Sequence, residues 1–95
     1  MKAYEIDFKE VKTYMNFYQT IIKAMGFPEW CGENPDAIWD VLTTDIEIPA
    51  IIYVKNLNYL PPELQEEGDM FLKIAYRACN WYKKLGMYVE IKIID

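Results

Sequence analysis

Histidine is absent from the 95-residue chain. Without it, the protein has no Ser-His-Asp or Cys-His catalytic arrangement, no His-ligated zinc site and no histidine general base. Cysteine is scarce as well, because Cys31 and Cys79 are too few for the disulfide framework of a small secreted domain. These absences exclude several of the commonest designs for catalysis and metal binding.

Long apolar runs are also missing. No stretch approaches the roughly 18 residues of a membrane-spanning helix, and the charged start MKAYEIDFKE does not resemble a signal peptide. We therefore expect a cytoplasmic protein. The length suits one domain covering residues 1–95, with 53% hydrophobic residues to build its core.

Basic residues are few and unevenly placed. Ten Lys and Arg oppose 15 Asp and Glu, so the net charge of −5 argues against binding to nucleic acid or anionic membranes. No basic residue lies between Lys23 and Lys55, an interval that contains Glu29, Glu33, Asp36, Asp40, Asp45 and Glu47. These acids form either a solvated face or a surface that attracts a basic partner.

The first half of the chain predicts a strand and two helices. Tyr4, Ile6 and Phe8 alternate with charged residues, which predicts a half-buried strand over residues 3–8. Apolar residues at helical spacing predict a helix over 13–25, which ends at Gly26. Asn34-Pro35-Asp36 is a typical helix start and predicts a short helix over 35–43.

The second half predicts two further strands and two further helices. The apolar run 50–54 predicts a strand covered on both faces, and the alternation over 88–94 predicts a strand with Val89, Ile91 and Ile93 on one face. Pro61-Pro62 favours a short helix through Glu67. Asp69 is expected to cap a longer helix that runs to about Leu85. The residues expected on its inward face are Phe71, Ile74, Ala78, Leu85 and either Trp81 or Tyr82. This order predicts an α/β fold with a three-stranded parallel sheet in the order 1-2-3 and about four helices.

Asp36 and Asp40 stand four residues apart and therefore share one face of the predicted helix. The pair is either a tolerated surface pair or an anion pair offered to an external cation. With Glu33 it could instead hold Mg²⁺ in a small metal-dependent enzyme. Such an enzyme needs a cleft and a phosphate-binding cation, neither of which the sequence suggests nearby. We therefore expect no catalytic residue, cofactor or metal.

Trp30 and Trp39 flank these acids. Aromatic side chains among charges are typical anchors of protein interfaces, although packing in the core is the alternative for both. Gly32 fits a sharp turn before Asn34. Both cysteines are expected to be unreactive, because Cys31 lies among carboxylates and Cys79 fits a buried position on a helix.

Residues 27–40, FPEWCGENPDAIWD, closely resemble the central motif of the barstar family of intracellular inhibitors of barnase-type ribonucleases. The preceding YQTIIKAMGFPE resembles the first helix of that family and its exit. The resemblance implies a three-stranded parallel α/β fold and binding to a basic ribonuclease, with one inhibitor for each enzyme. It further implies a toxin-neutralising role that confers immunity, while the net negative charge predicts no nucleic acid or membrane as partner.

The resemblance also implies roles for single residues. Asp40 corresponds to the carboxylate that enters the nuclease site where substrate phosphate would lie, and Asp36 corresponds to a second acidic contact. The remaining contact positions implied are Trp30, Gly32, Asn34, Trp39 and Thr43.

Three departures from the family pattern lie outside the motif. Thr44-Asp45 replaces a Gly-Trp pair, and Ala78 stands at the position of a Glu in the last helix. Pro61-Pro62 changes the connection after the second strand. These changes favour a different cognate nuclease, or an acidic interaction module that no longer binds one.

Overall fold

The computed structural model describes residues 1–94. Its elements follow in the order β1 (Lys2–Asp7), α1 (Tyr14–Met25), α2 (Pro35–Leu42), β2 (Ala50–Lys55), the 3₁₀ turns η1 (Leu57–Tyr59) and η2 (Pro62–Leu64), α3 (Gln65–Lys84) and β3 (Val89–Ile94). Each predicted strand is present, and the first two helices lie where the sequence predicted them.

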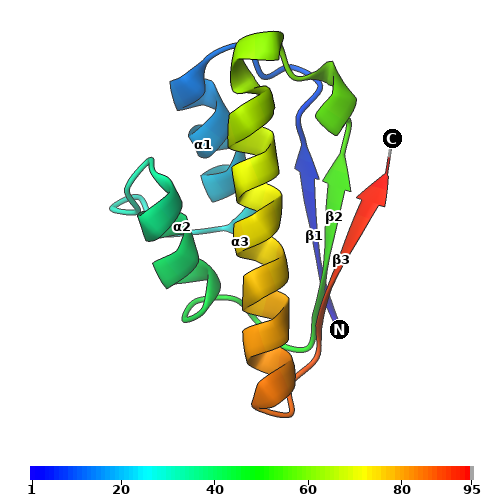
Figure 1. The fold of residues 1–95 in the computed structure, drawn as a ribbon. Coiled ribbons are helices and arrows are strands. Elements are labelled where there is room, and N and C mark those ends of the chain that lie inside the picture. The colour runs from blue at the N-terminus through cyan, green and yellow to red at the C-terminus, as the bar shows by residue number, and fades with distance from the viewer. Residues whose placement is uncertain (95) are drawn as a thin grey trace.

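The three strands are parallel and stand in the order β1-β2-β3, as predicted (Figure 1). Ala50 at the start of β2 lies beside Lys2 of β1 and Val89 of β3. The most apolar strand is therefore the central one. This agrees with the sequence, because a central strand has no exposed edge.

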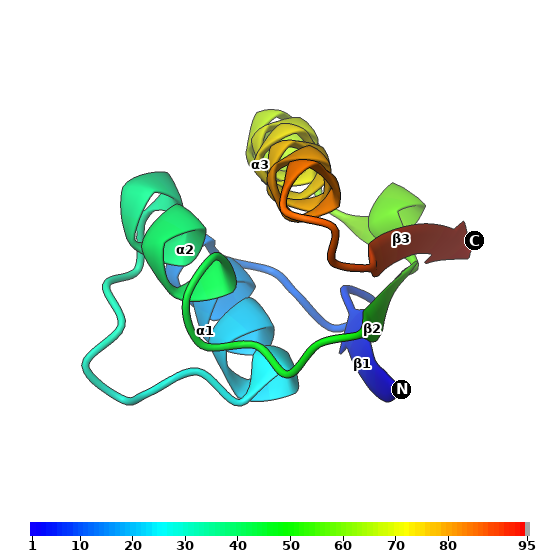
Figure 2. The same cartoon turned by 90° about the horizontal axis from the view of Figure 1, so that it is seen from below.

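All three helices lie on the same side of the sheet (Figure 2). Two right-handed crossovers that advance in the same direction place their helices on one face. The prediction that β2 is covered on both faces is therefore wrong. Ala50, Ile52 and Val54 are buried beneath the helices, whereas Ile51 and Tyr53 on the other face are only partly buried.

An aromatic cluster ties the two layers together. The Phe8 ring, just after β1, stacks on Phe17 of α1 with 5.1 Å between ring centroids. Phe71 of α3 meets the same ring edge-on at 6.1 Å. Phe8 and Phe17 are fully buried, so this contact joins the sheet to two helices in the middle of the core.

The last helix differs from the prediction at its start. Two separate helices were expected, over 61–67 and 69–85, but α3 begins at Gln65 directly after η2 and runs without a break. Asp69 is therefore inside the helix and does not cap it. Gly68 lies within α3 and packs against Leu60: a Cβ there would lie 2.8 Å from Leu60 Cδ1.

The inward face of α3 also differs at its end. Phe71, Ala75, Ala78 and Tyr82 are buried, whereas Trp81 and Leu85 are exposed. Leu85 was expected inward but follows the last helical residue, where the chain turns toward β3 through Gly86 at φ +75°. Of the two aromatic candidates, Tyr82 enters the core.

Two tyrosine hydroxyls fix the segment between α2 and β2. The Tyr82 hydroxyl donates to the Leu42 carbonyl at 2.8 Å in a buried position, which satisfies an otherwise free carbonyl at the end of α2. The Tyr4 hydroxyl accepts from the Glu47 N–H at 3.0 Å. The position of α2 therefore depends on residues from both layers.

Residues 1–94 contain no helix with the length and apolar character needed to cross a bilayer.

We predict that Tyr82→Phe lowers the free energy of unfolding by about 1–2 kcal/mol, because the buried Leu42 carbonyl loses its donor. Urea denaturation measures this loss. Tyr59→Phe is the matched control, since Tyr59 is exposed and the change should cost less than about 0.5 kcal/mol. Equal effects of the two changes would show that the Tyr82 hydrogen bond does not stabilise the fold.

Candidate partner-binding surface

The loop between α1 and α2 is held at two points and presents one large side chain. Phe27 and Cys31 are buried, and the Cys31 N–H donates to the Pro28 carbonyl at 3.0 Å. Trp30 lies between these points and is 77% exposed. A tryptophan this exposed contributes nothing to the core, so the alternative of core packing is wrong for Trp30.

The start of α2 is built by Gly32 and Asn34. The Asn34 Oδ1 accepts from the Ala37 N–H at 2.9 Å, the helix cap that the sequence predicted. Gly32 passes so close that a Cβ would lie 2.9 Å from Asn34 Nδ2 and 3.1 Å from Ala37 Cβ. Both residues therefore shape the surface from within.

The helix α2 has an apolar face and an acidic face. Ile38, Val41 and Leu42 are buried against the core. Asp36 and Asp40 are exposed, and neither forms an ion pair within residues 1–94. Asp36 lies in the first turn, where the helix dipole stabilises a carboxylate, while Asp40 receives little of this stabilisation.

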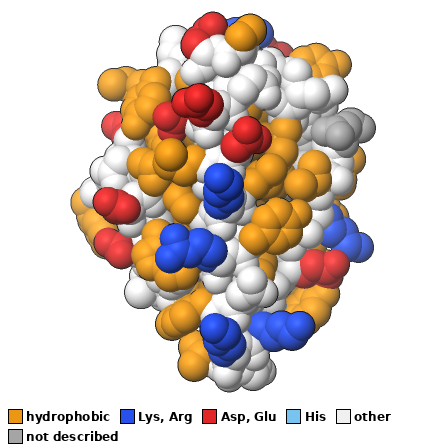
Figure 3. Space-filling view, in the orientation of Figure 1, with side chains coloured by type: hydrophobic (Ala, Val, Ile, Leu, Met, Phe, Trp, Pro, Cys, Tyr) orange, Lys and Arg blue, Asp and Glu red, His pale blue; other side chains and the backbone are white. Residues whose placement is uncertain are grey.

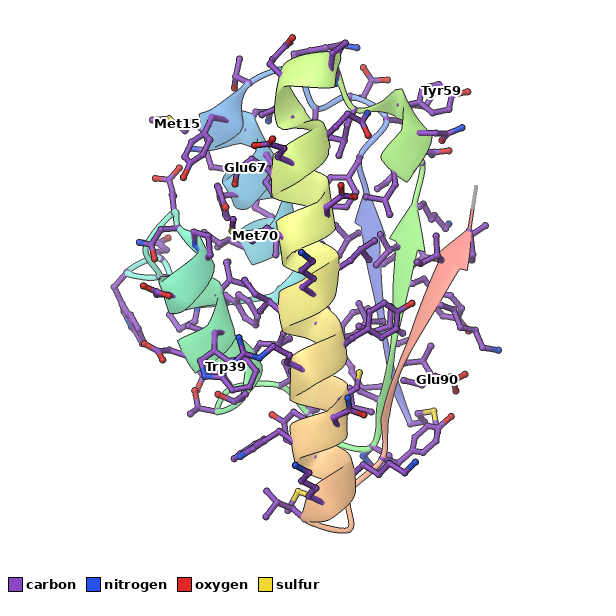
Figure 4. The ribbon with its side chains drawn as sticks, in the orientation of Figure 1. Met15, Trp39, Tyr59, Glu67, Met70 and Glu90 are labelled. Carbon is purple, nitrogen blue, oxygen red and sulfur yellow. The ribbon has the colours of Figure 1, made fainter. Side chains whose placement is uncertain are left out.

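Trp39 lies in a hollow between α2 and α3. The hollow, about 320 Å³, is lined by Pro35, Asp36, Trp39, Met70, Ile74 and Arg77. Figure 4 shows Trp39 and Met70, which come from the two facing helices. The Trp39 side chain is half-buried there, with the Arg77 guanidinium 5.3 Å from its ring centroid. This geometry is a cation–π contact.

Arg77 is a surface residue that sequence reasoning missed. Its contact with Trp39 joins residues 38 positions apart, so no local pattern indicates it. The available signal was the pair Lys73 and Arg77, four apart on the predicted last helix and therefore on one face. Figure 3 shows basic side chains over α3 beside acidic ones over α2 and its preceding loop.

The two threonines that follow α2 form hydrogen bonds to its backbone. The Thr43 hydroxyl donates to the Trp39 carbonyl at 2.9 Å, and the Thr44 hydroxyl donates to the Asp40 carbonyl at 2.7 Å. Both satisfy carbonyls at the helix end. Ala78, which stands in place of an acidic residue, is buried and presents no side chain to a partner.

The other acids of the interval are exposed but do not gather into a metal site. Glu29, Glu33, Asp45 and Glu47 are all on the surface. Within residues 1–94, no three His, Cys, Asp or Glu side chains converge as metal ligands would. The carboxylates are thus arranged along a surface and not around a point.

Cys31 is buried, whereas Cys79, which was expected to be buried, is only partly so. Burial raises the pKa of the Cys31 thiol. Burial, and then the charge of Glu90, raises the pKa of Cys79 to about 11. The thiolate is the reactive form, so both groups are poor nucleophiles. For Cys31 the cause is burial and not the neighbouring carboxylates that the sequence suggested.

Comparison with known proteins identifies a family and a relative. The family model "Barstar (barnase inhibitor)" matches residues 1–93. A protein of Bacillus subtilis (strain 168) named "Putative ribonuclease inhibitor YrdF" is 27% identical over 94 residues, which cover 99% of this chain and 98% of that protein. The family match extends over nearly the whole chain and includes both the sheet and α2. The chain therefore belongs to the barstar family.

Proposed function

We propose that this protein inhibits a basic ribonuclease by inserting the acidic face of α2 into the phosphate-binding part of the enzyme's active site. The observation that supports this most directly is the pair of exposed carboxylates, Asp36 and Asp40, on a helix whose other face is buried. A ribonuclease binds phosphate with cationic groups. Exposed carboxylates can bind the same cationic groups through charge-assisted hydrogen bonds.

Asp40 is the residue on which inhibition depends most. It is exposed, has no ion-pair partner within residues 1–94 and lies a turn beyond Asp36 along α2. Asp36 shares the hollow between the helices with Arg77, whose positive charge offsets part of its field. Of the two carboxylates, that of Asp40 is therefore the one whose negative charge is less offset by a neighbouring cation.

The surrounding residues complete the surface in two ways. Trp30 supplies an exposed aromatic side chain for packing on the enzyme, and Trp39 supplies a half-buried ring in the hollow. Gly32, Asn34 and Thr43 act through the shape of α2, because their close contact and hydrogen bonds lie within the protein. We assign all seven residues to the partner-binding surface.

The surface also fits a toxin-neutralising role with one inhibitor bound to each enzyme. The six acids of residues 24–54 are exposed and form no ion pair within residues 1–94, and Arg77 offsets only the charge near Asp36, so a negative field remains on this side of the protein. A basic enzyme approaching this side is attracted before contact, which raises the association rate. Rapid capture matters for an inhibitor that protects its own cell from a nuclease.

Substituting the acids one at a time tests the assignment. Removing one partner of a buried ion pair costs about 3–5 kcal/mol, because the other charge is left unpaired. We therefore expect Asp40→Ala to raise the inhibition constant at least about 100-fold, since each 1.4 kcal/mol is a factor of ten. Asp36→Ala should have a moderate effect. The measurement is inhibition of a barnase-type ribonuclease at increasing inhibitor concentrations.

Glu47→Ala is the matched control. Glu47 is an exposed acid of the same interval, and its backbone N–H, which binds Tyr4, is kept. A screened surface charge should change binding by less than about 1 kcal/mol. If Asp40→Ala inhibits as well as the parent while its thermal melt is unchanged, the insertion of α2 is not the mechanism. An unmodified protein that inhibits no such enzyme would instead favour the interaction module.

The salt dependence of the two rate constants tests the electrostatic attraction. The Debye length falls from about 10 Å at 0.1 M salt to about 3 Å at 1 M. We expect the association rate constant to fall steeply over this range while the dissociation rate constant changes much less. Stopped-flow fluorescence measures both rates, with Trp30 as a probe at the proposed contact. An association rate that ignores salt would mean that these acids are only solvated.

A further inference from the structure

The outer edge of β3 is a second surface of the protein. The sheet ends at β3, so one side of this strand has no partner strand within residues 1–94. The Ala50 N–H donates to the Tyr88 carbonyl, and the Asn56 N–H donates to the Ile94 carbonyl. The even-numbered residues of β3 therefore direct their backbone N–H and carbonyl groups toward β2. Because direction alternates along a strand, Val89, Ile91 and Ile93 direct theirs outward.

This edge lacks proline and bulges, two of the devices that usually prevent pairing, and its two charged residues, Glu90 and Lys92, have opposite signs. The strand contains no proline or glycine and is regular over six residues. Ile93 and Ile94 are 43% and 42% exposed, and Tyr88 just before the strand is 48% exposed. Ile93 lies on the helix-covered face in register with buried Val54, yet it remains exposed. The apolar side chains at this edge are therefore only half covered.

We propose that β3 pairs antiparallel with β3 of a second copy, with Ile91 opposite its own counterpart. A two-fold axis through this pair makes the contact self-complementary, as closed dimers require. Ile91 forms two backbone N–H to carbonyl hydrogen bonds with Ile91 of the other copy, and Val89 forms the same pair of bonds with Ile93 of the other copy. The two sheets become one continuous sheet, and the outward backbone groups of all three residues are satisfied.

The side chains select this register. Glu90 of each copy lies opposite Lys92 of the other, in the type of pair whose Cα atoms approach to about 4.5 Å. The Tyr88 hydroxyl donates to the Glu90 carboxylate, which holds that charge on the open face of the sheet. A shift of two residues in one direction would put Glu90 opposite Glu90, and in the other Lys92 opposite Lys92. Like charges directly opposite are destabilising.

The apolar residues match in the same register. On the open face, Tyr88 lies opposite Ile94 of the other copy, and both are exposed in the monomer. On the helix-covered face, the exposed Ile93 meets Val89 of the other copy. Pairing therefore covers the half-exposed side chains while it joins opposite charges.

The other edge of the sheet offers no such match. The Lys2 N–H donates to the Pro49 carbonyl and the Phe8 N–H to the Lys55 carbonyl, so the outward residues of β1 are Ala3, Glu5 and Asp7. If two copies of β1 paired antiparallel with the two-fold axis at Glu5, Glu5 would face Glu5 of the other copy. With the axis at Tyr4, Glu5 would face Ala3 of the other copy. Neither register of β1 joins opposite charges.

The proposed dimer leaves the partner-binding surface free. In both ribbon views, α2 and β3 lie on opposite sides of the molecule (Figures 1 and 2). Figure 4 shows Glu90 on the side of β3 away from α3, and therefore also away from α2. Each copy in the dimer can bind its own nuclease, so the ratio of one inhibitor to one enzyme is kept.

Charge exchange at positions 90 and 92 tests the register. Glu90→Lys places lysines opposite each other twice, and Lys92→Glu does the same with carboxylates. We expect each variant alone to raise the dimer dissociation constant at least tenfold in sedimentation equilibrium. An equimolar mixture of the two variants should restore association, because every opposite pair then joins a lysine to a carboxylate. Glu63→Lys, an exposed site on η2, is the control for net charge.

The unmodified protein gives a second measurement that needs no variant. Hydrogen exchange at the Ile91 and Ile93 amides should slow as protein concentration rises, while the Ala3 and Glu5 amides of β1 should not change. A mass that stays at 11.3 kDa up to about 1 mM protein would overturn the proposal. It would also be overturned if the mixture of variants associated no better than each variant alone.

Discussion

The placement of every helix on one face of the sheet determines what the rest of the molecule can do. The strand order β1-β2-β3 with right-handed crossovers leaves no other arrangement. Each helix then has one face on the core and one in solvent, so α2 can bury Ile38 and Val41 while it presents Asp36 and Asp40. The same arrangement leaves both outer strands with an open edge.

An eight-residue helix cannot be stable by itself, so α2 owes its order to its surroundings. Asn34 caps its start, Tyr82 from α3 binds its last carbonyl, and three apolar side chains fix its buried face. These contacts hold the acidic face in one orientation before any partner arrives. Binding to such a surface loses little conformational entropy, which favours high affinity from a small area.

Local patterns in the sequence predicted the strands, the first two helices and the Asn34 cap, because each depends on neighbouring residues. These patterns failed where the structure depends on contacts between residues far apart in the sequence. Leu60 packs against Gly68 inside α3, a contact that no local pattern indicates, and the partial exposure of Tyr53 depends on which side of the sheet the crossovers take. At the candidate site, Asp36, Asp40 and Trp30 could be named from spacing and type. Arg77 could not, since only the packing of α3 on α2 brings it to Trp39.

The unbalanced acids of residues 24–54 also set a limit on the stability of the free protein. Asp36 and Asp40 repel each other at a spacing where a Glu–Lys pair would stabilise the helix. A lysine at position 40 would therefore strengthen α2 and remove the charge that we assign to the partner. Mutations that survive a screen for thermal stability are expected to accumulate at these positions and to erode binding, so selection for function maintains a helix that selection for folding would change.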